Sequence, residues 1–564
     1  MRSSRRARPS PSARDLPDPK PRPGKRIAAP PWHAYVCAAA LVSATAAAYL
    51  PALHAEFIRW DDREYVSENQ LLRSAGGLKE IWTPLTGKLP QYYPLTFTSY
   101  WLEYRLWQLT PSGYHVTNVV LHAINAVLVL QLLRALGASP WIAFGAAAVF
   151  ALHPVQVESV MWVTERKNTL SACFYLLAFL LYLRHRRTGR WGAYAACVAL
   201  FGCALLSKTQ TVSLPITIAF TEWLLQRNNR LSRAAGPAVA ARLAPMLMLA
   251  LLSAWLTTAV ERQMMVSWVR LPALPERVLI AATAPWYYLA CFLAPFDLAP
   301  IAPKWVVSVA DPRWWAGLVV SVMVAVLVWR WYARIGAMLL WGGAEFFIAL
   351  IPGLGLVPFT YQHYSYVAMR FLYLSCVGGG VVLAALADWV AGTGWTRRRY
   401  AVAAAGVTVL AGYALLTRYE AEHWQTNLSF WRYAVARNPD SYPPNINLGL
   451  HYESQKQWPD ALHYYQRAYE LRPMDTYAFT QYLRAVSVVR GPQAVVDAAS
   501  TELRRSKVNA HVAHFYRAMG HEQLGQRDDA IQDYDRVLTL TRQGSGMWQA
   551  ARQSRDRLTH APAP

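Results

Sequence analysis

Two adjacent aspartates follow the first long apolar run of this chain. Asp61 and Asp62 stand where a membrane-spanning segment would give way to water. A carboxylate at such a boundary is costly unless it is solvated, paired or used. A positioned carboxylate can accept the proton of an attacking hydroxyl group, but either aspartate could instead cap a helix that begins near Glu64. The pair alone leaves both interpretations open.

More polar and charged side chains occur at the ends of later apolar runs. Arginine and lysine side chains there could clamp a phosphate or pyrophosphate at the membrane surface. Intramembrane ionisable groups tend to line a cavity, so we expect one site on the face that carries the aspartates. The candidate substrate-binding residues are His122, His153, Glu158, Glu165, Arg166, Lys167, Lys208 and Arg370.

Each of these candidates also has a purely structural interpretation. The two glutamates could form ion pairs with the neighbouring cations, and Lys208 and Arg370 could reach lipid headgroups. His122 is more readily an interhelical hydrogen-bonding group than a metal ligand. The six cysteines show neither zinc-ligand spacing nor a disulfide framework, and no ligand set in the sequence requires a divalent metal.

The composition is that of a polytopic membrane protein. Of 564 residues, 54% are hydrophobic and only 16% are charged, whereas soluble domains carry about 25% charged residues. The net charge of +23 is attributable to membrane topology and anionic lipid. We find no signature of RNA or DNA binding and expect no nucleic-acid partner.

Basic residues predict the orientation in the membrane. The Pro/Arg-rich tail 1–32, which we expect to be disordered, holds nine Lys and Arg against two Asp. This excess of positive charge places it in the cytoplasm. A first span at about 33–53 then leads into an aromatic-rich extracytoplasmic loop, 54–113. Ten further spans are expected near 115–136, 140–153, 169–183, 192–206, 211–225, 243–260, 314–331, 335–351, 371–390 and 400–416. The segment 278–312 is either re-entrant or interfacial, or adds two crossings, so the transmembrane domain 33–416 has 11 to 13 spans.

The region 417–564 has the composition of soluble helices and contains an internal sequence repeat. Leu448-Gly449, Asp460-Ala461, Ala468 and Pro473 follow the spacing of a tetratricopeptide repeat, and Ala434 and Pro439 repeat the last two at an offset of 34 residues. The unit at about 476–508 is degenerate. Such stacks form concave surfaces that commonly hold extended peptides, although a structural cap or a dimer surface is the alternative.

Several of these motifs together resemble a known family. The run from His153 to Ser171, His-Pro-Val-Gln-Val-Glu-Ser-Val-Met-Trp-Val-Thr-Glu-Arg-Lys-Asn-Thr-Leu-Ser, resembles a signature of the transmembrane and tetratricopeptide-repeat (TMTC) proteins, whose animal members are endoplasmic-reticulum protein O-mannosyltransferases. The resemblance is strong over 50–225 and weaker over 340–375. Further matches are Trp60-Asp61-Asp62 with Tyr65 and Asn69, Tyr93-Pro94-Leu95-Thr96, Gly113-Tyr114-His115 with Thr117-Asn118, Leu121-His122 and Asn125, Ser207-Lys208 with Leu214-Pro215, and Arg370-Phe371-Leu372-Tyr373-Leu374.

The resemblance implies an all-α fold of the C-type glycosyltransferase kind followed by a tetratricopeptide-repeat solenoid. It implies an inverting enzyme that uses a polyprenyl-phosphate-linked sugar, with Asp61 or Asp62 as general base and Asp61 preferred. Arg370 and the group Glu165-Arg166-Lys167 would face the phosphate leaving group. Met369 stands where relatives commonly have an acid, which makes the charge around Arg370 unusual. Relatives of this fold do not all need a metal.

We therefore expect a multi-pass protein of the cell (inner) membrane with its repeats in the periplasm. Its expected activity is transfer of a sugar to a Ser or Thr hydroxyl of an exported protein, as in O-mannosylation, with the protein partner held at the repeats. A glycan or lipid acceptor is one alternative. A non-enzymatic scaffold or translocator is another, against which the lack of visible inverted repeats argues.

Overall fold

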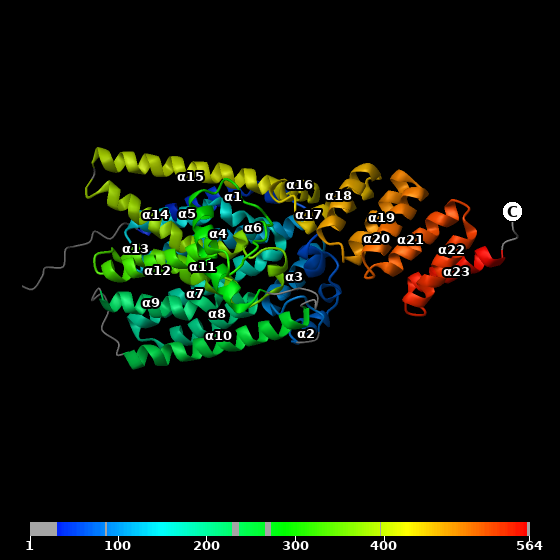
Figure 1. Cartoon of the computed structure of the whole chain (residues 1–564). Helices are drawn as coiled ribbons and strands as arrows, with labels where there is room; N and C mark the ends of the chain where they lie inside the picture. Colours follow the sequence, from blue (N-terminus) through cyan, green and yellow to red (C-terminus); the bar gives the residue numbers. More distant parts are fainter. Residues whose placement is uncertain (1–30, 85–86, 228–235, 265–271, 395, 561–564) are drawn as a thin grey trace, which may run out of the picture.

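The computed structural model describes residues 31–84, 87–227, 236–264, 272–394 and 396–560, so nearly all of the predicted tail 1–32 lies outside the described residues. Every regular element in these ranges is helical. A bundle forms from α1 to α15, and eight further helices extend from one end of it (Figure 1). The bundle helices are α1 Pro31–Ala48, α2 Gly77–Ile81, α3 Pro94–Trp107, α4 Pro111–Ala135, α5 Pro140–Leu152, α6 Val157–Met161, α7 Arg166–Thr188, α8 Trp191–Ser207, α9 Leu214–Arg227, α10 Gly236–Met264, α11 Leu274–Leu293, α12 Trp315–Trp331, α13 Ala337–Leu350, α14 Ser375–Ala391 and α15 Arg397–His423.

Each predicted span coincides with a helix, but the helices differ in length. Within the described ranges, four helices are long and apolar enough to cross a membrane, namely Pro111–Ala135, Gly236–Arg262, Pro312–Trp331 and Arg397–His423. The segments Pro140–Leu152 and Pro154–Met161 pass the same test together but are bent by 52° at His153. Ala34–Ala48, Trp191–Ser207, Ala337–Gly353 and Ser375–Ala391 are shorter apolar helices. The number of crossings therefore stays a prediction.

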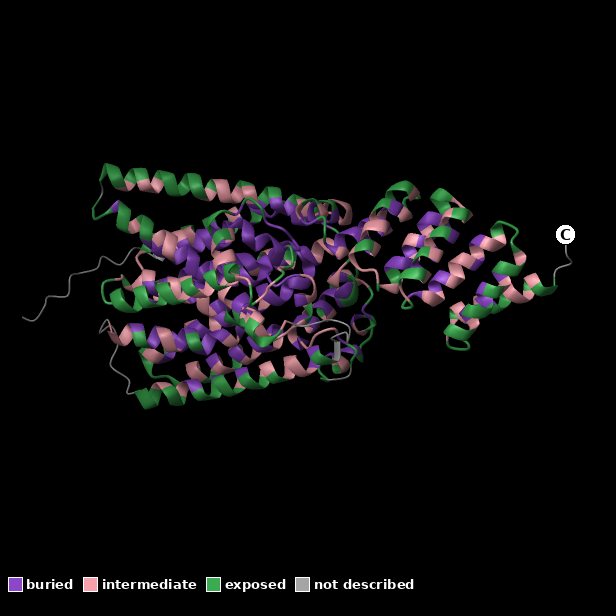
Figure 2. Cartoon of the chain, in the orientation of Figure 1, coloured by how far each residue is buried: buried purple, intermediate pink, exposed green. Residues whose placement is uncertain are grey.

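Apolar side chains cover the outside of the bundle. No residue of α12 is buried, and its exposed large apolar side chains are valine, leucine, methionine and tryptophan. Exposed positions also run along α10 and α15, whereas buried residues gather at the centre of the bundle (Figure 2). An apolar exterior around a buried polar interior suits helices that face lipid.

Glycines bring α13 and α14 into close contact. A methyl group on Gly378 would lie 2.4 Å from the carbonyl oxygen of Gly342, and one on Gly380 would lie 2.8 Å from the carbonyl oxygen of Ala146 in α5. Only residues without a side chain permit this approach, as is usual between membrane helices. The close packing anchors the start of α14, directly after the turn Met369–Leu372 that carries Arg370.

The ambiguous segment 278–312 forms one helix and an irregular return. Arg277, near the start of α11, donates to the carbonyl oxygen of Leu356 at 2.9 Å. After α11 ends, the carbonyl oxygen of Leu298 accepts from Tyr433 of α16 at 3.1 Å. The return segment therefore lies at the end of the bundle that carries the repeats. These contacts favour the re-entrant or interfacial alternative over two full crossings.

The helices after α15 form stacked pairs. They are α16 Asn427–Arg437, α17 Tyr442–Ser454, α18 Trp458–Leu471, α19 Thr476–Arg490, α20 Pro492–Arg505, α21 Ala510–Gln523, α22 Arg527–Leu540 and α23 Gly546–His560. The starts of α17, α19 and α21 are 34 residues apart. The degenerate unit thus keeps the predicted period, which is compatible with tetratricopeptide repeats. Gly449 permits α17 to approach α18, because a methyl group there would lie 2.4 Å from the ring of Tyr465.

The fold class expected from the sequence, an all-helical bundle followed by stacked helix pairs, is confirmed over the ranges that the structure describes.

Candidate functional site

The segment between α5 and α7 folds into a compact buried turn. Pro154 cannot continue a helix from α5, and the His153 imidazole accepts a hydrogen bond from the Val155 amide at 3.3 Å. The chain then forms the short helix α6 and a turn at Val163–Glu165 before α7 begins at Arg166. Residues 151–169 are all buried. The turn brings its glutamates inside the bundle at the end that carries the repeats.

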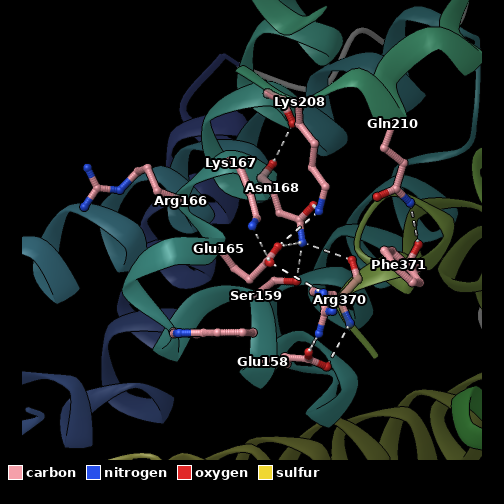
Figure 3. A network of polar contacts seen from close by, with 12 residues as sticks. Glu158, Ser159, Glu165, Arg166, Lys167, Asn168, Lys208, Gln210, Arg370 and Phe371 are labelled. Carbon is pink, nitrogen blue, oxygen red and sulfur yellow. Dashed lines mark hydrogen bonds and ion pairs between the residues drawn. The ribbon is translucent and has the colours of Figure 1, made fainter. Parts of the chain in front are cut away.

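Glu165 is the centre of a group of charges (Figure 3). Its Oε1 atom lies 3.3 Å from the Lys167 ammonium and 3.5 Å from Arg370 Nε. Its Oε2 atom lies 3.1 Å from the Lys208 ammonium. Three cations from α7, the end of α8 and the turn before α14 thus converge on one carboxylate. All four side chains are less than one-tenth exposed.

A second carboxylate and an amide complete the group. Glu158 forms an ion pair with the Arg370 guanidinium and also accepts from the Arg370 backbone amide at 3.1 Å. The Asn168 side chain accepts from Lys208 at 2.7 Å and donates to Glu165 at 2.8 Å and to the Arg370 carbonyl at 3.0 Å. Asn168 lies one helical turn after Glu165, so helical periodicity could have identified it from the sequence.

Burial and the neighbouring charges shift the pKa values of this group in different directions. Burial raises the pKa of Glu158 although Arg370 opposes the shift. Burial alone would raise the pKa of Glu165, but Lys167, Lys208 and Arg370 outweigh it and lower this pKa to about 2. Burial lowers the pKa of Lys208 to about 8, although Glu165 opposes the shift. When all five of these side chains are ionised, the three cations exceed Glu158 and Glu165 by one positive charge, not counting Asp61. This excess would suit an anionic ligand.

A polar chain extends from Lys167 to α10. The Lys167 ammonium lies 3.4 Å from Gln91 Oε1, to which the Tyr65 hydroxyl also donates at 2.6 Å. The Gln91 amide donates to Glu261 at 2.8 Å, and Glu261 accepts from the Thr360 amide at 3.0 Å. Sequence reasoning missed Gln91, because a glutamine in an aromatic-rich loop carries no distinctive spacing.

The two aspartates have different surroundings. Asp62 is fully buried, and its oxygens accept from the Ile58 amide at 2.9 Å, the Thr164 amide at 2.9 Å and the Thr164 hydroxyl. Burial raises the pKa of Asp62 to about 7 against these hydrogen bonds. Asp62 therefore ties its loop to the turn that carries Glu165.

Asp61 is partly exposed, and its carboxylate makes no hydrogen bond to any residue in the described part of the chain. Burial raises its pKa, while Lys167 and Arg370 lower it. The Asp61 carboxylate is thus within the electrostatic reach of the cation group and remains available to another molecule.

Arg166 does not join this group. Adjacent residues on a helix point about 100° apart, and the Arg166 side chain points away from the cations around Glu165 (Figure 3). Its guanidinium pairs with Glu103 at 2.9 Å and donates to the Tyr114 carbonyl at 2.7 Å and to Asn118. These contacts hold α7 against α3 and α4.

The two histidine candidates lie in packing contacts. His122 hydrogen-bonds to the Tyr373 hydroxyl at 2.9 Å and to the Ala151 carbonyl at 3.1 Å. His153 hydrogen-bonds to the Phe292 carbonyl at 2.8 Å and stacks on the Phe292 ring. The structure thus brings Glu158, Glu165, Lys167, Lys208 and Arg370 together, and places His122, His153 and Arg166 elsewhere in the same half of the bundle.

Among the described residues, no three His, Cys, Asp or Glu side chains are grouped as a metal site would require. The chemistry that the group itself offers is the binding of an anion by three cations beside an available carboxylate.

Comparison with known proteins supports the resemblance given by the motifs. No protein-family model matches the sequence. Protein O-mannosyl-transferase Tmtc1 of Drosophila melanogaster is 35% identical over 173 residues, covering 29% of this chain and 20% of that protein. Protein O-mannosyl-transferase TMTC3 of Mus musculus is 32% identical over 185 residues, covering 31% and 20%. The resemblance to TMTC proteins is confirmed for this part, although the matched region spans only about a fifth of the length of these relatives.

Solved structures show a more distant likeness. ArnT from Cupriavidus metallidurans in the apo state matches with a TM-score of 0.38 and 15% identity over 83% of this chain and 79% of ArnT. The same protein bound to undecaprenyl phosphate matches with a TM-score of 0.35 and 14% identity over 84% and 80%. At these scores the likeness carries no argument about the site.

Proposed function

We propose that this protein is a membrane glycosyltransferase of the C type that moves a sugar from a polyprenyl-phosphate donor to a hydroxyl acceptor. The observation that carries the proposal is the convergence of Lys167, Lys208 and Arg370 on Glu165, with the available carboxylate of Asp61 within electrostatic reach. The sequence similarity to protein O-mannosyl-transferases favours Ser or Thr of a protein as the acceptor.

The donor phosphate would bind at the cations. Each lysine ammonium has three N–H donors, of which Lys208 uses two on Glu165 and Asn168. A phosphodiester carries one negative charge, which matches the single positive charge in excess around Glu165. The polyprenyl tail would leave the site along the apolar outside of the bundle.

The transfer step needs one base and one stabilised leaving group. The Asp61 carboxylate takes the proton of the acceptor hydroxyl as its oxygen forms a bond to the anomeric carbon of the sugar. The bond from that carbon to the phosphate oxygen breaks, and the phosphate keeps the electron pair. Lys167, Lys208 and Arg370 stabilise the negative charge that develops on the phosphate. Attack opposite the leaving group inverts the anomeric centre.

The proposed orientation follows from the positive-inside rule. The site lies at the end of the bundle that carries the repeats, since residues 56–60 contact α16 directly. With the basic tail in the cytoplasm, this end faces the periplasm. The repeats would then hold the acceptor protein beside the site. A reporter fused after residue 564 tests this orientation, and cytoplasmic reporter activity would contradict it.

The test of the activity uses vesicles that contain the full-length protein and a polyprenyl phosphate linked to a labelled sugar. We expect labelled Ser or Thr peptides, with inverted anomeric configuration by NMR. Replacing Asp61 by Asn should lower the transfer rate roughly 10²- to 10⁴-fold. The matched control is D460N, because Asp460 is an exposed aspartate in the first turn of α18. Wild-type rates in D61N would refute the base, and label on glycan or lipid alone would refute the protein acceptor.

A further inference from the structure

The loop that carries Asp61 is held by the junction between α15 and α16. The Glu56 amide donates to the carbonyl oxygen of Gln425 at 2.7 Å. The side chain of Asn427, two residues after Gln425, also binds the loop. Its Nδ2 donates to the Phe57 carbonyl at 2.8 Å, and its Oδ1 accepts from the Arg59 amide at 2.6 Å. One amide side chain thus satisfies both a backbone acceptor and a backbone donor of the loop.

The neighbouring backbone groups of this loop have their own partners. The Glu56 carbonyl lies 3.2 Å from Nε2 of His115, and the Ile58 amide donates to Asp62 at 2.9 Å. The loop is therefore fixed from three sides, namely α4, Asp62 and the start of the repeats. The partners from α4 and Asp62 hold two of these groups, and Asn427 holds two others, the Phe57 carbonyl and the Arg59 amide.

Trp60, the residue before Asp61, also contacts α16. The Trp60 ring stacks on Trp162 with ring centroids 4.9 Å apart, and lies 5.8 Å from Trp431 of α16. Helix α16 thus contacts the loop once through an amide and once through an indole, immediately before Asp61. The position of Asn427 suits this role, because it is the first residue of α16, where Thr426 and Ser429 cap the helix and leave the Asn427 side chain free to reach the loop.

We infer that Asn427 is a positioning residue for the proposed base: through it, the repeat domain sets the geometry of the Asp61 loop. The inference rests on the proposed function, in which Asp61 takes the acceptor proton. It means that the first helix of the repeat domain is part of the architecture of the site as well as a route to an acceptor. An acceptor that shifts α16 would move the base with it.

The experiment compares the full-length variants N427A, N427D and N447A. Asn447 is the matched control, because its side chain donates at 2.9 Å to Pro443 within its own helix. Asp at 427 can still accept from the Arg59 amide but cannot donate to the Phe57 carbonyl, and it adds a charge beside Glu56. Hydrogen exchange of a peptide covering 55–63, the melting temperature, kcat and the donor KM are measured for each variant.

For N427A we expect faster exchange in this peptide and a kcat lower by roughly 10- to 100-fold, the effect of a misplaced catalytic group. The donor KM should change by less than about twofold, because the cation group is untouched. N427D should show the same faster exchange and lower kcat as N427A, and N447A should behave as wild type. If N427A does not fold, N427D alone decides.

Unchanged exchange in N427A or N427D would overturn the inference, as would faster exchange at wild-type kcat. Failure of the proposed function is distinguishable from these outcomes. Full transfer activity in D61N, or absence of transfer in the wild type, would refute the base and leave the exchange measurement to decide whether Asn427 holds the loop.

Discussion

Replacing Asp61 and Asp62 by alanine, one at a time, distinguishes a catalytic role from a role in stabilising the fold. The Asp61 carboxylate makes no hydrogen bond within the described ranges and is partly exposed, whereas the Asp62 carboxylate is buried and accepts from three donors. Removing the Asp62 carboxylate leaves the Ile58 amide, the Thr164 amide and the Thr164 hydroxyl without their acceptor. Removing the Asp61 carboxylate leaves no protein donor unsatisfied.

These contacts set the expected magnitudes. A buried donor without an acceptor costs about 1–3 kcal/mol, so D62A should lower the free energy of unfolding by at least about 3 kcal/mol. D61A should change it by less than about 0.5 kcal/mol, as at other positions without such contacts. Loss of a general base lowers a rate about 10²- to 10⁴-fold, so D61A should raise the activation barrier of transfer by about 3–5 kcal/mol.

Thermal unfolding in detergent and transfer of labelled sugar in vesicles measure the two effects on the same preparations. We expect D61A to have the melting temperature of the wild type but to lose sugar-transfer activity. We expect D62A to have a lower melting temperature. The reasoning is refuted if D62A melts with the wild type but loses transfer while D61A retains it. That result would make Asp62 the base.

Three further predictions follow from the charges. Burial raises the pKa of Asp61 and Lys167 lowers it. The variant K167M should therefore move the acidic limb of the kcat/KM profile to higher pH, because Asp61 then ionises only at higher pH. An acidic limb that stays in place would show that Asp61 is not the titrating base. Because burial lowers the pKa of Lys208 to about 8, the donor KM should rise above pH 8 as this cation loses its charge, and K208R, which remains charged, should abolish the rise. R166M should lower the free energy of unfolding by about 3–5 kcal/mol, because it leaves the buried Glu103 unpaired, with no change in donor KM; a raised KM at an unchanged melting temperature would return Arg166 to the substrate site.

Local patterns made much of this protein predictable. Apolar runs located the bundle helices that were expected as spans, since a segment of that composition and length can satisfy its backbone only as a helix in lipid. Pro154 marked the break after α5. The 34-residue spacing of small residues predicted the helix pairs, and α19 and α20 keep the period although their sequence has lost the pattern. The acid pair was visible as an anomaly of charge at an apolar boundary.

The tertiary structure decided which of these residues meet. Arg166 and Lys167 are neighbours in the sequence, but the start of α7 turns one toward α4 and the other toward Glu165. Lys208 and Arg370 reach the same carboxylate from distant helices, and only helix packing sets such long-range contacts. From the sequence, Asp61 and Asp62 were alternative candidates for the base, with Asp61 preferred. The fold distinguishes them, because the Thr164 and Ile58 donors lie around Asp62 and leave the carboxylate of Asp61 available.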